Sequence, residues 1–131
     1  LGLTNARFDG APLAFDRAGW GSIADSVAVL HQKQSARLAE SCKRLSHGDT
    51  WARAREALSP MLPKAAWIKG VLQQAGAAHR IEDIGIDRER FLWAVLNGAQ
   101  MRERFTSLDL AWATGVLPDA ADEIIDTYLV R

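Results

Sequence analysis

The chain has 131 residues, the length of one ordinary domain, and it is long enough to bury a continuous core. Sixteen Lys and Arg balance sixteen Asp and Glu, so the broad electrostatic attraction that favours nucleic acids or acidic membranes is absent, and we expect neither as a partner. The one cysteine, Cys42, cannot form an internal disulfide, and no apolar run approaches the roughly 18 residues of a membrane span. We therefore expect a soluble protein of the cytoplasm.

The start of the chain predicts a loop-like approach to a long helix. Residues 1–21 lack a sustained apolar period, so we expect an extended or loop-like arm there. Because the first residue is not Met, we also expect the natural protein to extend further in the N-terminal direction. Ser22 with Asp25 is typical of a capped helix start, apolar residues then recur at helical spacing, and Gly48 ends the helix. The polar Gln34 interrupts this apolar stripe.

Two shorter helices are predicted next. Asp49 or Thr50 can cap the first, and Pro60 ends it, because proline lacks the amide proton that a continuing helix needs. Pro63 suits the first turn of the second helix, and Gly76 suits the left-handed residue that follows its end. The apolar stripe of this second helix comprises Ile68, Val71, Leu72 and Ala75.

Three further helices are predicted in the C-terminal part of the chain. After a connector over residues 77–86, Asp87 caps a helix that continues to about Glu103. Thr106 and Asp109 have the spacing of a capping box, which predicts the start of a short helix. The last helix is predicted from a proline at its start and an apolar stripe behind it, namely Pro118, Ala121, Ile124, Ile125, Tyr128 and Leu129.

These patterns define the expected fold class. No segment alternates apolar and polar residues as a strand does, so we expect no sheet. About six helices joined by short turns must bury their stripes against one another, which predicts an all-α helical bundle over residues 22–131 and a single domain over residues 1–131. The five tryptophans are expected at helix crossings.

The sequence offers little support for chemistry contained within the chain. His31, His47 and His79 are not spaced to share a helix face, so we expect no metal site among them. No strand, glycine turn and helix follow one another as a nucleotide-binding loop requires. Cys42 lies near the apolar stripe of the first helix and is expected to be a small core residue, not a nucleophile.

Arg102 and Arg104 are the two candidate site residues. If the preceding helix continues, Arg102 projects from its buried side, where a guanidinium needs an anionic partner. Glu103, the charge of the helix C-terminus, or a bound anion such as phosphate can each serve as that partner. The sequence alone favours a structural role and leaves the anion site as the alternative.

Five short pieces of the chain, between about Ala66 and Leu117, resemble the C-terminal helical region of the glycerol-1-phosphate dehydrogenases. This family belongs to the superfamily of dehydroquinate synthase and iron-containing alcohol dehydrogenase. The pieces occur in the order and at the spacing of the family pattern. They are Ala75-Gly76, Glu82-Asp83-Ile84-Gly85-Ile86, Arg88-Glu89-Arg90-Phe91, the run from Arg102 to Leu110, and Gly115-Val116-Leu117.

The resemblance implies a two-domain α/β plus α enzyme of which this chain is the C-terminal helical domain. An N-terminal nucleotide-binding domain would bind NAD(P), and a divalent metal (zinc, nickel or iron) between the domains would be held by an aspartate and two histidines upstream of Leu1. The implied reaction is reversible hydride transfer between NAD(P)H and dihydroxyacetone phosphate, a phosphorylated ketone, giving sn-glycerol 1-phosphate. Arg102 and Arg104 match the two arginines of the family motif and are candidates for orienting the substrate phosphate. No catalytic, cofactor or metal residue is expected within the 131 residues, so the fragment alone should not be active.

A second interpretation remains open. A neutral charge, no catalytic constellation and five tryptophans are also compatible with a stand-alone helical protein-interaction module. Neither interpretation decides whether the chain assembles as a homo-oligomer.

Overall fold

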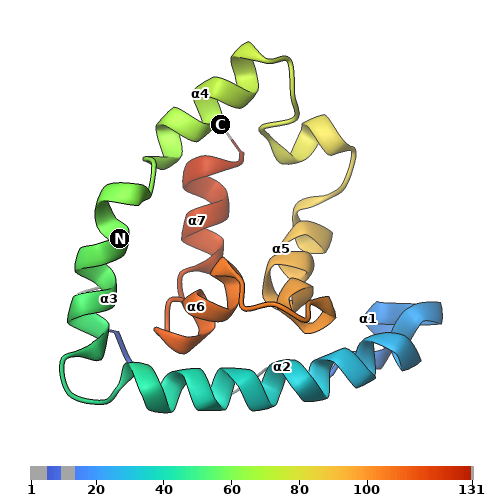
Figure 1. The fold of residues 1–131 in the computed structure, drawn as a ribbon. Coiled ribbons are helices and arrows are strands. Elements are labelled where there is room, and N and C mark those ends of the chain that lie inside the picture. Colours follow the sequence, from blue (N-terminus) through green and yellow to red (C-terminus); the bar gives the residue numbers. More distant parts are fainter. Residues whose placement is uncertain (1–5, 10–13, 131) are drawn as a thin grey trace.

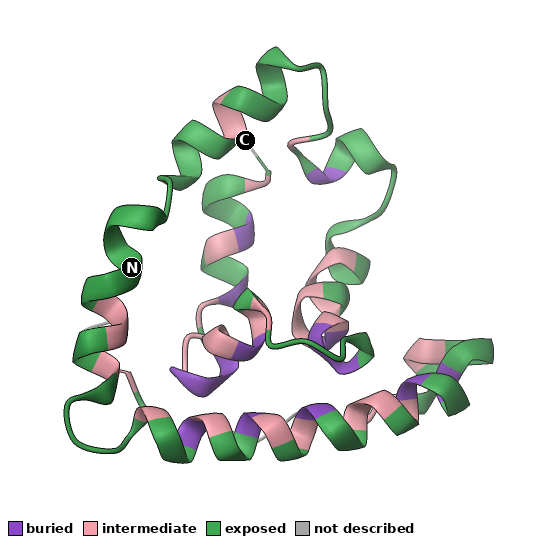
Figure 2. Ribbon diagram, viewed as in Figure 1, coloured by how far each residue is buried: buried purple, intermediate pink, exposed green. Residues whose placement is uncertain are grey.

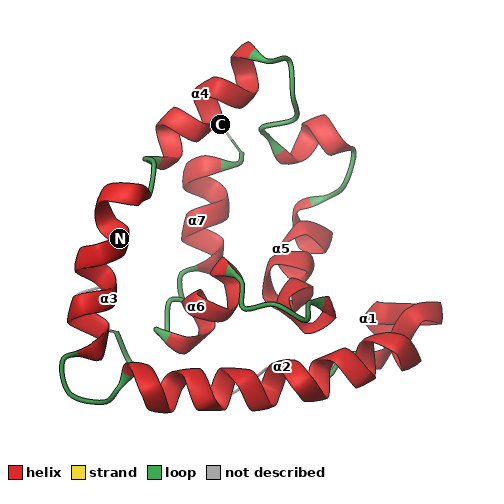
Figure 3. Ribbon diagram, in the orientation of Figure 1, coloured by secondary structure: helices red, strands yellow, loops and turns green. Residues whose placement is uncertain are grey.

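The computed structural model describes residues 6–9 and 14–130, and over these residues every regular element is helical, as predicted (Figure 3). The α-helices are α1 (Arg17–Trp20), α2 (Ala24–Leu45), α3 (Thr50–Leu58), α4 (Ala65–Gln74), α5 (Arg88–Asn97), α6 (Ser107–Ala113) and α7 (Ala121–Tyr128). Short 3-10 turns adjoin or join them, namely η2 (Gly21–Ile23), η3 (Ser59–Met61), η4 (Ile81–Ile84) and η5 (Gly98–Met101).

The helices form an open frame built on α2 (Figure 1). At 22 residues, α2 is about 33 Å long and lies along one edge of the molecule. The turn η5 and helix α6 pack on α2. Helices α5 and α7 lie side by side and extend away from α2. Helices α3 and α4 form a separate side of the frame, and α4 touches the end of α7.

The core lies where α2, α6 and the start of α7 meet. Leu38 and Cys42 from α2 pack with Trp112, Leu117 and Ala121, and all five side chains are buried. Figure 2 shows buried residues along one side of α2 and on α6 and α7, whereas α3 and α4 are mostly exposed. The expectation that Cys42 is a core residue is confirmed.

Several predicted helix ends are confirmed. Gly76 adopts the left-handed conformation, with φ 68°, and the amide of Ala77 bonds to the carbonyl oxygen of Leu72 across the helix end. Asp87 caps α5 through a 2.7 Å bond from the Arg90 amide. Ile125, in the predicted stripe of α7, has no exposed surface.

Other boundaries differ from the predictions. Arg17–Trp20 forms a helical turn within residues 1–21, which were expected to be extended or loop-like. Asp16 caps this turn by accepting from the Gly19 amide at 2.9 Å. Asp25 makes no cap and pairs with Arg17 instead. Helices α4 and α7 begin two or three residues after the prolines that were expected in their first turns.

The most consequential difference concerns α5, which ends at Asn97 and not near Glu103. The chain tightens into the 3-10 turn η5, in which side chains three residues apart lie over one another. Gln100 is thereby turned inward, where its side chain donates to Asn97 at 3.1 Å and accepts from Trp20 at 2.9 Å. The backbone then becomes extended at Arg102, with φ −115° and ψ 134°.

Candidate phosphate-binding site

The two candidate arginines lie on a short non-helical segment, residues 102–106, which joins η5 to α6 and which we call the arginine strap. At its first end, the amide of Arg102 bonds to the carbonyl oxygen of Ala99 at 3.1 Å. Along its middle, the guanidinium of Arg37 on α2 donates to the carbonyl oxygens of Arg102 at 2.9 Å and of Glu103 at 2.5 Å. The Arg37 side chain on α2 is therefore hydrogen-bonded to two successive carbonyl groups of the strap.

The second end of the strap is fixed by the capping box that the sequence predicted. The carboxylate of Asp109 accepts from both the amide and the hydroxyl of Thr106, at 2.7 and 2.6 Å, and the Asp109 amide donates back to that hydroxyl at 3.3 Å. Gln34 of α2 donates to the other carboxylate oxygen at 3.0 Å. Asp109 has no exposed surface and Gln34 is 3 % exposed, so this end of the strap is tied to α2 within the protein interior.

The side chains of Arg102 and Arg104 are exposed, which corrects the expectation that Arg102 projects from a buried helix face. The early end of α5 is the reason, because the extended backbone at Arg102 turns its side chain away from the helix packing. Within the described residues neither guanidinium makes a hydrogen bond or ion pair, and Glu103 faces Lys33 at 3.6 Å. The two charges are thus held on a fixed backbone and remain available to an anion.

The sequence identified the two arginines and the Thr106–Asp109 capping box, but it did not identify the α2 residues that hold the strap. Gln34 was noticed only as an interruption of an apolar stripe, and Arg37 lies three residues further along the same helix. Two polar residues on the inner side of a long helix were the signal, since buried polar groups almost always have partners. His31, three residues before Gln34, continues this polar line.

The three histidines are not brought together. His31 on α2 stacks on Phe15 with ring centroids 5.3 Å apart, and burial lowers its pKa. His47 is exposed after the end of α2, and His79 lies in the connector before η4. Across residues 6–9 and 14–130, no three His, Cys, Asp or Glu side chains are grouped so that they could hold a metal ion.

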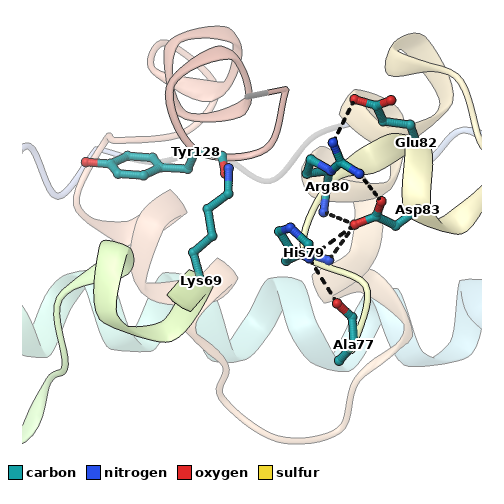
Figure 4. A network of polar contacts seen from close by, with 7 residues as sticks. All are labelled: Lys69, Ala77, His79, Arg80, Glu82, Asp83 and Tyr128. Atoms are coloured by element: carbon teal, nitrogen blue, oxygen red, sulfur yellow. Dashed lines mark hydrogen bonds and ion pairs between the residues drawn. The ribbon is translucent and has the colours of Figure 1, made fainter. Parts of the chain in front are cut away.

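A second polar network surrounds His79 (Figure 4). The carboxylate of Asp83 accepts from the backbone amides of His79 and Arg80, each at 3.0 Å, and from the Arg80 guanidinium at 2.9 Å. These bonds, led by the one from the His79 amide, lower the pKa of Asp83 from 3.8 to about 2. The network stabilises the turn η4 and lies apart from the arginine strap.

No protein-family model matches the chain, and no curated protein or solved structure is significantly similar to it. Among the helices of the described segments, none is long and apolar enough to pass through a bilayer.

Proposed function

We propose that this chain is the C-terminal helical domain of a metal-dependent, NAD(P)-linked dehydrogenase that acts on a phosphorylated polyol or ketone. The expected reaction is the reduction of dihydroxyacetone phosphate to sn-glycerol 1-phosphate. The proposal rests on five ordered motif pieces and extends to a cytoplasmic location. The observation that carries it is the arginine strap, because the most distinctive of those pieces is a fixed segment that presents two exposed guanidinium groups.

The strap suits the phosphate end of the substrate. A phosphate dianion accepts charge-assisted hydrogen bonds, and guanidinium groups supply them as paired donors. Because Arg37, Thr106 and Asp109 already fix the strap backbone, little of the binding energy is lost in ordering it. In this proposal Arg102 and Arg104 bind and orient the phosphate and take no part in bond making.

The redox chemistry belongs elsewhere in the parent enzyme. Reduction moves a hydride from the nicotinamide to the carbonyl carbon, and a proton goes to the carbonyl oxygen. No three of the described His, Cys, Asp and Glu residues of this chain are grouped so that they could hold a metal ion. Metal and NAD(P) are assigned to an N-terminal nucleotide-binding domain outside these 131 residues.

The test begins with the natural gene. The gene should encode a nucleotide-binding fold ahead of Leu1, and this fold should contain an aspartate and two histidines as metal ligands. The purified product should oxidise NADH or NADPH in the presence of dihydroxyacetone phosphate when loaded with zinc, nickel or iron. A gene without such a fold, or a product without turnover with any of these metals, would contradict the proposal.

A stand-alone interaction module is the second candidate, and one observation favours it. Helix α4 and the turn before it expose large apolar side chains, among them Met61, Leu62 and Trp67. If the natural product is no longer than this chain and binds a protein through α4, the module interpretation replaces the dehydrogenase.

A further inference from the structure

The side of the frame formed by residues 50–74, which we call the arm, is unusually apolar for an exposed segment. The arm comprises α3, η3 and α4. Met61 is 76 % exposed, Leu62 64 % and Trp67 63 %, so the prediction that every tryptophan lies at a helix crossing is wrong for Trp67. Seven large apolar side chains of the arm are exposed in all, namely Leu58, Met61, Leu62, Trp67, Ile68, Val71 and Leu72. An apolar surface of this density marks an interaction site.

The arm contacts α2 through α3 and contacts α7 through α4, and two apolar cavities lie beside it. One, of about 290 Å³, lies between α4 and the segments η4, α5 and α7, with Ile68, Leu72 and Phe91 in its wall. The other, of about 280 Å³, lies between α3, the end of α2 and the start of α6, with Leu58 and Phe105 in its wall. Both are recessed between helices, and each has room for one or two side chains.

The charged side chains in the described walls of these cavities are basic. Arg44 lines one cavity and Lys69 and Arg80 line the other, while no Asp or Glu is among the described residues of either wall. Asp83 pairs with Arg80 and offsets part of this charge. Behind the wall, Glu82 also lies 3.9 Å from Arg80. The arm itself carries four basic residues, Arg53, Arg55, Lys64 and Lys69, against the single acid Glu56. A complementary surface would therefore be apolar and flanked by carboxylates.

We propose that the arm and its two cavities are the docking site for a protein surface with protruding apolar side chains and flanking Asp or Glu residues. This inference rests on the proposed function, under which the occupant is the nucleotide-binding half of the same enzyme. Protruding side chains reach recessed cavities, which the flat surface of a bilayer does not. Two copies of this chain would bring two basic arms together, so self-association through the arm is electrostatically disfavoured.

Hydrogen exchange of residues 58–72, measured by mass spectrometry, tests this inference. The natural gene product is compared with residues 1–131, and exchange in the arm should be at least about tenfold slower in the natural product. Val71→Asp should restore fast exchange, because it places a charge on the docked face. Val29→Asp on α2 is the matched control, since Val29 is 57 % and Val71 44 % exposed, and it should have no effect. Lys64→Glu should also weaken protection, less so at high salt.

Several outcomes overturn the inference. Equal exchange in both proteins, or a natural product that adds no further chain, leaves the arm without this occupant. Protection that appears only with anionic vesicles indicates a lipid surface, and a dimer of residues 1–131 that Val71→Asp dissociates indicates a second copy. Turnover with an unprotected arm contradicts only the docking, whereas a protected arm without turnover contradicts only the dehydrogenase.

Discussion

Asp109 accepts hydrogen bonds from three donors at one end of the arginine strap. Its buried carboxylate accepts from the Thr106 amide and hydroxyl and from the Gln34 side chain. Asp109→Ala should lower the free energy of unfolding by roughly 3 kcal/mol, because the buried Gln34 amide loses its partner and the half-buried Thr106 amide and hydroxyl lose theirs. Urea denaturation measures this change. Asp25→Ala is the control, since Asp25 is highly exposed and its pairing with Arg17 should contribute little; similar losses in both variants would contradict the account of Asp109.

Because the pKa of Asp83 is lowered in the folded protein, we expect the stability of the protein to depend on pH in the acidic range. Because folding lowers the pKa of Asp83 from 3.8 to about 2, its contribution is fully present above about pH 4 and is lost as the pH falls towards 2. The Tm of wild type should exceed that of Asp83→Asn above pH 4, and the difference should shrink between pH 4 and 2. A Tm difference that is independent of pH over this range would show that Asp83 does not act through its charge.

At the scale of elements, the arginine strap should depend on Arg37 more than on the neighbouring surface ion pair. Arg37→Met removes both bonds to the strap carbonyls, so the Arg102 amide should exchange with solvent about tenfold faster by NMR. Lys33→Met removes only the 3.6 Å contact with Glu103 and should leave this exchange unchanged. Equal rates in wild type and Arg37→Met would mean that the strap is held without Arg37.

The helices themselves were largely predictable, because their ends depend on local chemistry. The Thr106–Asp109 capping box, the cap at Asp87 and the left-handed Gly76 each act within a few residues, and each lies where the sequence predicted. The end of α5 was not predicted, and it coincides with a contact between Gln100 and Trp20 that joins distant parts of the chain and that local patterns do not reveal. The exposure of Arg102 follows from this early helix end, so the position of the candidate site was predicted but its geometry was not.

At the scale of the whole molecule, the frame joins a well-packed part to a sparsely packed one. The core at α2, α6 and α7 is buried, whereas the arm leaves its apolar stripe exposed over two cavities. The spacing of apolar residues correctly predicted the apolar stripe of α4. It could not predict what covers this stripe, because the amphipathic pattern of a helix is the same whether the helix packs within its own chain or on another chain. Under the proposed docking, the nucleotide-binding half of the enzyme covers this exposed stripe.

The steady-state kinetics of the proposed full-length dehydrogenase test the central claim most directly, through the KM for dihydroxyacetone phosphate in Arg102→Ala. Loss of one charge-assisted contact with phosphate should raise this KM roughly 10- to 100-fold and leave the KM for the nicotinamide cofactor within about twofold. Arg17→Ala, which removes an exposed arginine that is paired with Asp25 and makes no contact with the strap among the described residues, should change neither constant. An unchanged KM for dihydroxyacetone phosphate in both Arg102→Ala and Arg104→Ala would contradict the assignment of the strap as a phosphate site.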